Sequence, residues 1–496
     1  MIGEQTFAVP EISAFLNEDV VSAFVGGRSA AASHGETFVT YDPGSGQPLA
    51  HVAALTSDDI DRAILVAEEA FKSSGWKRLP PNERAVSLHR LADTVERRKL
   101  VLAEIEALDT GILRSVALDD VQNVVDTLRY YADLSVSVQR RSVLPVAGHE
   151  AWTVRLPWGP CGFILPWNAP MLLLGWNIAP ALAAGNTVVV KPASDSSLST
   201  VYFARLASEA GIPDGVINVV TGSGPIAGAA LAAHPKLKRM ALTGSTEVGL
   251  LVAEACARNL TPVKLELGGK GAAVVFDDAD LEATVEGLAR AITSRTGQVC
   301  CDATRWLIQK PIYDEFVAAS IDRLARVRIG YQLDPSTQMG PVVNEKQRQR
   351  VLTYLRRGRD EGAQALLEGG VASVAGHDGF YVRPALLGGS LDNVAAREEI
   401  FGPVAFLTPF QDEDEAVELV NRTDYGLANS VWTKDLDRAY RIAEEMVAGN
   451  SWINAHNVVP RGVPYGGVNK SGMGGGVQSV ETLFDYWRGQ SIVRPL

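Results

Sequence analysis

The chain has 496 residues, of which 46% are hydrophobic and 21% are charged, the usual balance of a globular protein with two or three domains of roughly 100–200 residues. Its net charge of −12 argues against a nucleic-acid or anionic-membrane surface, because such partners usually require concentrated Lys and Arg. Small-molecule partners are therefore the better expectation.

The cysteines and the N-terminus indicate a reducing compartment. The four cysteines have neither the density of a disulfide scaffold nor the spacing of a zinc site, so we expect no metal. The N-terminus lacks the basic start of a secretory signal, and no run reaches the ~18 consecutive apolar residues of a membrane span. These features predict a cytoplasmic protein with no membrane partner.

Folded structure is expected from the first residues onward. Ser57 is a plausible cap for a helix whose Ile60, Ile64, Ala67 and Phe71 form one apolar stripe. Residues 1–135 are thus not a linker.

The clearest architecture lies between residues 160 and 270, where β-rich runs alternate with helical stretches. Gly185 and Gly211 follow two of the helices, where a left-handed residue is common. Continuous apolar strands between helices indicate a buried parallel sheet, hence a doubly wound α/β domain whose ligands lie beyond the carboxyl ends of the strands. The expected strands are 161–165, 187–191, 216–220, 239–243 and 262–267, and the expected helices are 169–184, 198–210, 225–233 and 246–258.

A second α/β domain is predicted to begin near residue 269. Two apolar strands, 272–276 and 306–310, flank a helix over 279–295 and restart the alternation. The segment 136–152 and the tail from 480 fit neither alternation, and we expect them to form strands of a small projecting sheet.

The chemistry is indicated by Cys300 in GQVCCDATR and Glu266 in ELGGK. A thiolate can attack an electrophilic carbon, and a separate carboxylate can later activate water against the resulting ester. The pair therefore predicts covalent catalysis with a distinct base.

Seven runs in order resemble the aldehyde dehydrogenase superfamily, and the resemblance extends from residue 24 to the final residues. It implies a coenzyme-binding domain over 1–135 and 153–268, a catalytic domain over 269–470, and an oligomerisation segment over 136–152 and 471–496. The runs are LPWNAP (165–170), VVVKPAS (188–194), LTGSTEVG (242–249), LELGGK (265–270), GQVC (297–300), EEIFGPV (398–404) and YGGVNKSG (465–472).

The resemblance assigns three catalytic residues, each with a plainer alternative. Cys300 would be the nucleophile, although a buried cysteine is more often inert filling. Asn168 and the Cys300 amide would hold the oxyanion, whereas Asn168 could also cap the next helix. Glu266 would be the general base, or an ordinary salt-bridge partner. The neighbouring Cys301 is expected only to pack.

The resemblance also implies a site for NAD or NADP. Gly244, Ser245 and Thr246 open a helix whose free N–H groups suit a pyrophosphate, and Thr243 precedes them as a further expected cofactor residue. Glu399 and Phe401 would hold the nicotinamide ribose and ring. Lys191 would contact the adenosine ribose, and Ser194, where NAD-preferring members often have Glu, favours tolerance of NADP and leaves a preference for NADP open. The remaining expected cofactor residues are Leu165, Pro166, Trp167, Gly224, Val248 and Leu267.

The substrate entrance departs from the family pattern. The stretch 293–296 is polar where many members carry aromatic residues, which leaves Trp176, Val459 and Tyr465 as expected lining residues. Arg295 and Arg461 could recognise an acidic aldehyde, but an isolated Arg near a pocket is more often a structural partner. The sequence selects no particular aldehyde.

Two further departures concern the catalytic residues. Asp302 stands two positions after the nucleophile, where a small residue is usual, and a charge there would raise the thiol pKa if it faced the pocket. We expect it to face away. GMGGG (472–476) replaces the common G-x-G-R-E, so a supporting Arg–Glu pair is missing.

The sequence therefore predicts a homodimeric or homotetrameric enzyme that oxidises a small-molecule aldehyde to a carboxylic acid with NAD(P)+, through a cysteine thiohemiacetal and thioester. One alternative is a coenzyme-A-acylating relative, which the presence of Glu266 disfavours. The other is a non-catalytic binding or structural homologue.

Overall fold

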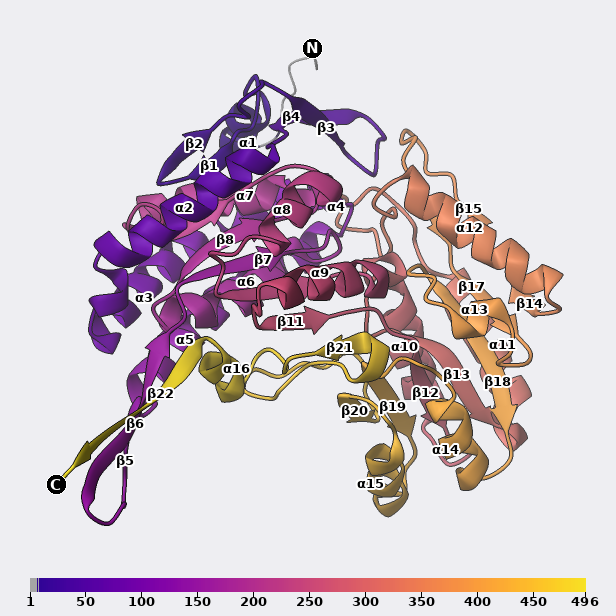
Figure 1. The fold of residues 1–496 in the computed structure, drawn as a ribbon. Helices are drawn as coiled ribbons and strands as arrows, with labels where there is room; N and C mark the ends of the chain where they lie inside the picture. Colours follow the sequence, from indigo (N-terminus) through magenta and orange to yellow (C-terminus); the bar gives the residue numbers. More distant parts are fainter. Residues whose placement is uncertain (1–6, 8) are drawn as a thin grey trace.

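An eight-stranded sheet organises the first half of the chain in a computed structural model that describes Phe7 and residues 9–496 (Figure 1). Its five central strands run parallel, and the outer strands are antiparallel to their neighbours. In spatial order the strands are β2 (Arg28–Ala30), β1 (Ala23–Val25), β9 (Ile217–Val219), β8 (Thr187–Lys191), β7 (Pro160–Ile164), β10 (Arg239–Thr243), β11 (Val263–Glu266) and β21 (Gly472–Met473).

Helices cover both faces of this sheet, which confirms the predicted doubly wound arrangement. Gly185 and Gly211 follow their helices with φ of 96° and 80°, as their positions required. The helices are α2 (Ser57–Ser73), α3 (Pro81–Arg97), α4 (Lys99–Thr110), α5 (Arg114–Ser137), α6 (Pro170–Ala183), α7 (Leu198–Glu209), α8 (Ala229–Ala232) and α9 (Thr246–Arg258), and a short π-helical turn, Gly224–Gly228, precedes α8.

The predicted cap of helix α2 was wrong by one residue. Thr56 is the cap, and its hydroxyl accepts from the Asp59 amide while the Asp59 carboxylate accepts from the Thr56 amide. This reciprocal capping box makes Thr56 a better cap than Ser57, which is the first helical residue.

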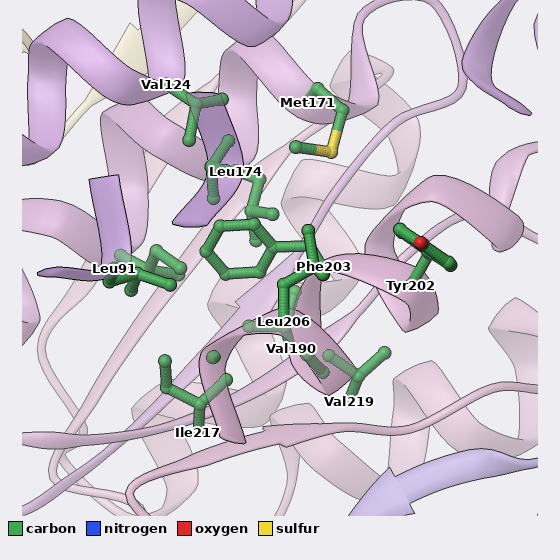
Figure 2. Close-up of a cluster of buried hydrophobic side chains, with 14 of the residues drawn as sticks. Leu91, Val124, Met171, Leu174, Val190, Tyr202, Phe203, Leu206, Ile217 and Val219 are labelled. Atoms are coloured by element: carbon green, nitrogen blue, oxygen red, sulfur yellow. The ribbon is translucent and has the colours of Figure 1, made fainter. Parts of the chain in front are cut away.

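The core of this region lies between the sheet and helices α3, α5, α6 and α7 (Figure 2). Phe203 of α7 is fully buried among Leu91, Val124, Leu174 and Val190, which come from three other helices and from β8. Burying a side chain of this size stabilises a fold by about 1.5–3 kcal/mol. The packing fixes α6, and with it the loop that precedes α6, against the sheet.

A seven-stranded sheet organises the second half. The predicted strands at 272–276 and 306–310 and the helix between them are confirmed as β12 (Gly271–Val275), β13 (Ala303–Gln309) and α10 (Leu281–Thr293). In spatial order the strands are β14 (Gln364–Leu367), β17 (Ala385–Gly388), β18 (Val404–Phe410), β13, β12, β19 (Ala428–Trp432) and β20 (Asn450–Ile453), and the further helices are α11 (Tyr313–Ala325), α12 (Glu345–Asp360), α13 (Val394–Arg397), α14 (Glu413–Asn421) and α15 (Leu436–Glu445).

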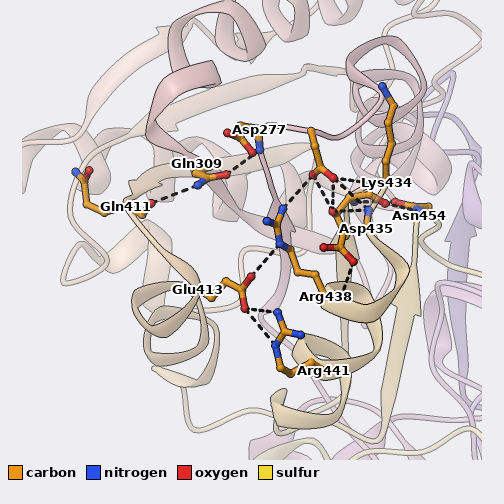
Figure 3. A network of polar contacts seen from close by, with 11 residues as sticks. Asp277, Gln309, Gln411, Glu413, Lys434, Asp435, Arg438, Arg441 and Asn454 are labelled. Atoms are coloured by element: carbon orange, nitrogen blue, oxygen red, sulfur yellow. Dashed lines mark hydrogen bonds and ion pairs between the residues drawn. The ribbon is translucent and has the colours of Figure 1, made fainter.

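A polar network joins α14 and α15 at the edge of this sheet (Figure 3). Glu413 accepts from Arg438 Nε at 2.9 Å and from Arg441 Nη2 at 2.7 Å. Asp278, beyond the end of β12, accepts from Thr433 and from the Asp435 amide. Because these groups are partly exposed, each ion pair contributes at most about 1 kcal/mol.

The third sheet projects from the first half of the chain (Figure 1). It consists of β5 (Arg141–Leu144), β6 (His149–Pro157) and β22 (Trp487–Pro495), all antiparallel, which confirms the small projecting sheet. Two details differ from the expected division. Strand β6 crosses the expected boundary at 152, and β21 pairs with β11 although its residues were placed with the projecting segment. Residues 480–485 form helix α16 (Val480–Asp485).

Candidate active site

A left-handed turn after α10 presents Cys300. Arg295, Thr296 and Gly297 have φ of 48°, 58° and 68°, and a β-branched residue such as Thr296 rarely adopts this conformation, which is strained by about 1–3 kcal/mol. The Thr296 hydroxyl compensates by donating to the Gly340 carbonyl at 2.9 Å. Gly269 then allows close approach, since a Cβ there would lie 2.3 Å from the Cys300 carbonyl oxygen.

The Cys300 thiol lies 3.7 Å from the Tyr465 hydroxyl. Its pKa is lowered, chiefly by a hydrogen bond from the Cys301 thiol and further by Tyr465, whereas burial acts in the opposite direction. The Cys301 thiol also lies 3.2 Å from Asn457 Oδ1, a second acceptor for its single S–H proton. Cys301 packs as expected, and when its proton points to Cys300 instead of Asn457 it favours the Cys300 thiolate, which the sequence did not indicate.

Asn168 lies on the loop after β7 and shares a cavity with Cys300. Its Nδ2 donates to the Gln298 carbonyl at 2.8 Å, so one amide hydrogen is fixed and the other remains for a ligand. The alternative reading of Asn168 as a helix cap is wrong, because the cap of α6 is Ala169.

Glu266 ends strand β11 with 7% of its surface exposed. Within the described part of the chain, neither carboxylate oxygen has a well-formed hydrogen bond, although the Gly467 amide faces the group closely enough to lower its pKa. Burial dominates and raises the pKa well above its ordinary value, against the nearby charge of Lys264. The carboxylate is near enough to Cys300 for their charges to interact, but it does not line the cavity.

Backbone occupies the place of the missing Arg–Glu pair. A Cβ on Gly476 would lie 2.5 Å from the Tyr465 carbonyl, so no side chain fits there. Lys264 donates to the Gly476 carbonyl and pairs with Asp485 at 2.7 Å. Lys264 is thus the cation beside Glu266.

Asp302 is buried and accepts from Asn457 Nδ2 at 2.9 Å. Burial raises its pKa well above the ordinary value, because a charged carboxylate is poorly solvated there. It is absent from the cavity lining, in line with the expectation that it faces away, although it is near enough to Cys300 for their charges to interact.

A cavity of about 400 Å³ opens in front of Cys300 and Asn168. It reaches the N-terminus of α9, where free N–H groups suit an anion, and the carboxylate of Glu399, which accepts from the Gly269 amide at 3.0 Å. The rings of Trp167 and Phe401 meet edge to face at 5.3 Å. These groups fit a dinucleotide. The predicted cofactor residues on the lining are Pro166, Trp167, Thr243, Gly244, Ser245, Leu267, Glu399 and Phe401.

The aldehyde dehydrogenase family model matches residues 30–492. The chain belongs to this family. It is 40% identical over 457 residues to retinal dehydrogenase 2 from Gallus gallus, covering 91% of this chain and 87% of the relative, and 38% identical over 470 residues to an aldehyde dehydrogenase from Emericella nidulans, covering 94% of each. The NAD+ complex of aldehyde dehydrogenase from Bacillus cereus superposes with a TM-score of 0.95 at 36% identity over 99% of each chain.

The protein is thus an NAD(P)-dependent aldehyde dehydrogenase. Across the described residues, no group of three or more His, Cys, Asp or Glu side chains is arranged to hold a metal. None of the described helices is both long and apolar enough to cross a membrane.

The remaining predicted cofactor residues of this dehydrogenase lie off the cavity lining. Lys191 is buried, which lowers its pKa to about 8, and it donates to the Pro192 carbonyl at 2.8 Å. The Ser194 hydroxyl donates to the Gly222 carbonyl at 3.1 Å. The other residues in this group are Leu165, Gly224 and Val248.

Sequence reasoning missed a second wall of the cavity. Asn344 caps helix α12, and the first turns of this helix bring cations to the cavity. The run NEKQRQR signals a capped helix start, but nothing in it indicates which sheet the helix faces. The missed lining residues are Leu173, Asp195, Gly268, Val343, Asn344, Lys346, Gln347 and Arg350.

On the other side of the thiol, the three predicted substrate residues gather in one apolar cluster with Cys300 and Cys301, formed further by Leu427, Ala428 and Val477. The rings of Trp176 and Tyr465 are 5.6 Å apart, and Val459 packs against the cluster. Arg295 and Arg461, which the sequence left open as groups that recognise an acidic aldehyde, both form ion pairs within the protein. Arg295 pairs with Asp120 and Arg461 with Asp126.

Proposed function

We propose that Cys300 is the nucleophile of this aldehyde dehydrogenase, with Asn168 as oxyanion donor and Glu266 as general base. One observation carries the proposal. A thiol with a lowered pKa shares a cavity with an amide that has one unused N–H, and near the thiol lies a buried carboxylate to which the described residues make no well-formed hydrogen bond.

The chemistry follows from these groups. The Cys300 thiolate adds to the carbonyl carbon, and the oxygen, now negative, accepts from Asn168 and from the Cys300 backbone amide. The nicotinamide ring, when bound, accepts the hydride released from that carbon. The resulting thioester is attacked by water, whose proton passes to Glu266, and the carboxylic acid leaves as the C–S bond breaks.

Glu266 can act as a base only when ionised. Because burial raises its pKa, its carboxylate fraction grows with pH above the ordinary range of a glutamate. Hydrolysis of the thioester should therefore quicken as pH rises. A base tuned toward neutral pH is more effective than an ordinary carboxylate.

The two alternatives are less well supported. A coenzyme-A-acylating enzyme has no use for a carboxylate beside the thioester, and here the strand end delivers one. A non-catalytic homologue would have no reason to keep a thiol of lowered pKa in a cavity with an oxyanion donor.

NAD is the cofactor supported best, and NADP should be tolerated. Ser194 carries no charge that would repel a 2′-phosphate, and Lys191 lies close to it in sequence. The Asp195 carboxylate on the cavity lining acts in the opposite direction. Lys346 and Arg350 supply positive charge for the phosphates.

The lining favours an uncharged, apolar aldehyde. The polar groups near the cluster are already engaged, since the Trp176 indole donates to Asn123, the Trp452 indole donates to the Val458 carbonyl, and Arg461 pairs with Asp126. No cation is left for a substrate carboxylate among these residues. The name of the Gallus gallus relative, retinal dehydrogenase 2, points to an apolar aldehyde of the same kind.

We also propose the expected domain division, adjusted so that all of β6 belongs to the projecting sheet and β21 to the first sheet, together with a homodimer or homotetramer and a cytoplasmic location. Val143 and Val493 on the projecting sheet are 79% and 58% exposed, and Leu250 and Leu251 on α9 are each 60% exposed. Exposed apolar groups on a projecting sheet and on one helix suit burial against further copies of the chain.

The test is reduced-nucleotide formation with apolar, aromatic and acidic aldehydes, supplied with NAD+ or NADP+. Turnover that prefers apolar aldehydes supports the proposal. Turnover that requires coenzyme A, or that is fastest with acidic aldehydes, would contradict it.

A further inference from the structure

Arg295 closes a ring of three hydrogen bonds between the loops that carry Asn168 and Cys300. Its guanidinium donates from Nη1 to the Asn168 carbonyl at 3.2 Å. Asn168 donates from Nδ2 to the Gln298 carbonyl at 2.8 Å, and Gln298 donates from Nε2 to the Arg295 carbonyl at 2.9 Å. Each hydrogen bond joins the side chain of one of these three residues to the backbone of another. Displacement of one residue therefore displaces the other two.

Buried carboxyl groups anchor this ring. Arg295 Nη2 pairs with Asp120 Oδ1 at 2.5 Å, and the two side chains are only 11% and 5% exposed. Beside Asp120, the fully buried Glu106 accepts from the Met171 amide at 3.2 Å in the first turn of α6. Burial, with the Asp120 charge adding to it, raises the pKa of Glu106 well above its ordinary value. Burial raises the pKa of Asp120 as well, and the nearby charge of Arg295 acts in the opposite direction on both carboxyl groups.

The strained turn points the Arg295 carbonyl toward Gln298. With φ of 48° at Arg295 and 58° at Thr296, the Arg295 carbonyl accepts from both the backbone amide and the side chain of Gln298, at 3.1 Å and 2.9 Å. Gln298 is held from its other end as well, because its Oε1 accepts from the Val343 amide at 3.0 Å. Residues in rare backbone conformations persist when their surroundings fix them, and they cluster at functional sites.

We propose that Arg295 is a positioning residue that sets the orientation of the Asn168 amide relative to Cys300. The ring commits one N–H of Asn168 to Gln298 and thereby aims the other at the substrate oxygen. Arg295 does not line the cavity, and its guanidinium is paired with Asp120. It is therefore not available to bind a negatively charged substrate. The inference rests on the proposed oxyanion role of Asn168.

A double-mutant cycle tests the proposal. The variant is Arg295→Met with Asp120→Asn, which removes both charges together and keeps most of the side-chain volume, measured with and without Asn168→Ala. Because a misplacement of about 1 Å at a reacting group can reduce the rate about 100-fold, we expect a fall in kcat of about that size, with little change in cofactor affinity. In the Asn168→Ala background the same change should reduce kcat by less than about threefold.

Two further variants keep the test decisive. Arg295→Lys retains the charge and one donor, so it should recover part of the lost kcat, and it serves if the double substitution fails to fold. Arg441→Gln removes an exposed ion pair far along the chain and should leave kcat unchanged. Equal losses in both Asn168 backgrounds, or wild-type kcat in the folded variant, would overturn the positioning role.

The proposed function fails separately, if wild-type protein oxidises no aldehyde. In that case a crystal structure of the Arg295→Met/Asp120→Asn variant decides the positioning role. An Asn168 amide turned away from Gln298 supports it, and an unchanged amide overturns it.

Discussion

The two sides of Cys300 are built in opposite ways. On the side of Asn168, the loops are joined by hydrogen bonds of 2.8–3.2 Å, which fix one N–H of the amide and leave the other for the substrate oxygen. On the side of Glu266, the carboxylate is buried with no well-formed hydrogen bond from the described residues, and glycines stand around it. Stabilising a developing charge requires rigid donors, whereas a base must change its protonation state. The contrast suggests a fixed oxyanion site beside a less restrained base.

Replacing the nucleophile should lower kcat the most, because the chemistry on both sides of the site depends on the thiol. Cys300→Ala should lower kcat by about 10⁴-fold or more, because without the thiol no covalent intermediate forms. Reduced-nucleotide formation followed at 340 nm measures it. Cofactor affinity should remain, and significant residual turnover would show that the reaction does not pass through this thiol.

Removing the rigid donor should have the next largest effect. Asn168→Ala should lower kcat by about 100- to 1000-fold, since one preorganised donor to the oxyanion is lost. Single-turnover kinetics should show the loss in the step that ends in hydride release and also in thioester hydrolysis, because the same oxygen becomes negative when water adds to the thioester. If Asn168→Ala slowed thioester hydrolysis alone, Asn168 would act with the base and not as the oxyanion donor.

Replacing the adjacent Cys301 should have a smaller effect, on the pKa of Cys300. Cys301→Ala removes the hydrogen bond that most lowers the Cys300 pKa, so that pKa should rise and the thiolate fraction at pH 7 should fall. The rate of Cys300 alkylation by iodoacetamide should drop several-fold at pH 7, and its midpoint should move to higher pH. An unchanged midpoint would leave Cys301 with packing alone.

The last expected effect is confined to one cofactor. Ser194→Glu should reduce kcat/KM with NADP+ by about tenfold and leave the value with NAD+ nearly unchanged, because a carboxylate repels the 2′-phosphate. Asp195→Asn is the matched change in the opposite direction and should improve the use of NADP+. Equal effects on both cofactors would place these side chains away from the 2′ position.

The fold and the contrast between the two sides were predictable to different degrees. Apolar runs such as TVVVK at 187–191 were correctly read as strands, because a strand covered on both faces needs continuous apolar residues. The cap at Thr56 was missed although Thr and Asp at 56 and 59 already formed the capping signature. Local signals thus placed most elements to within a residue or two, but strand β13 begins three residues before its predicted start, and α8 begins at Ala229 after a π-helical turn where a helix was predicted from 225.

Contacts between distant parts of the chain could not be predicted. Asp120 and Arg295 are separated by 175 positions, and no periodicity connects them, so the sequence left Arg295 open as a substrate-reading group. The wall formed by α12 depends on how the second sheet docks against the first. The motifs lie within single elements, whereas the packing of distant elements against one another decides which polar side chains are paired with each other and which are free to bind a ligand.

The most direct measurement is made on Glu266→Gln, which removes the base and keeps the volume of the side chain. We predict that one equivalent of reduced nucleotide per active site forms rapidly, and that steady turnover then falls by about 1000-fold and loses its rise with pH. Intact-protein mass spectrometry should find the acyl group on Cys300. Steady turnover at the wild-type rate, or a burst with no acyl adduct on that cysteine, would contradict the account.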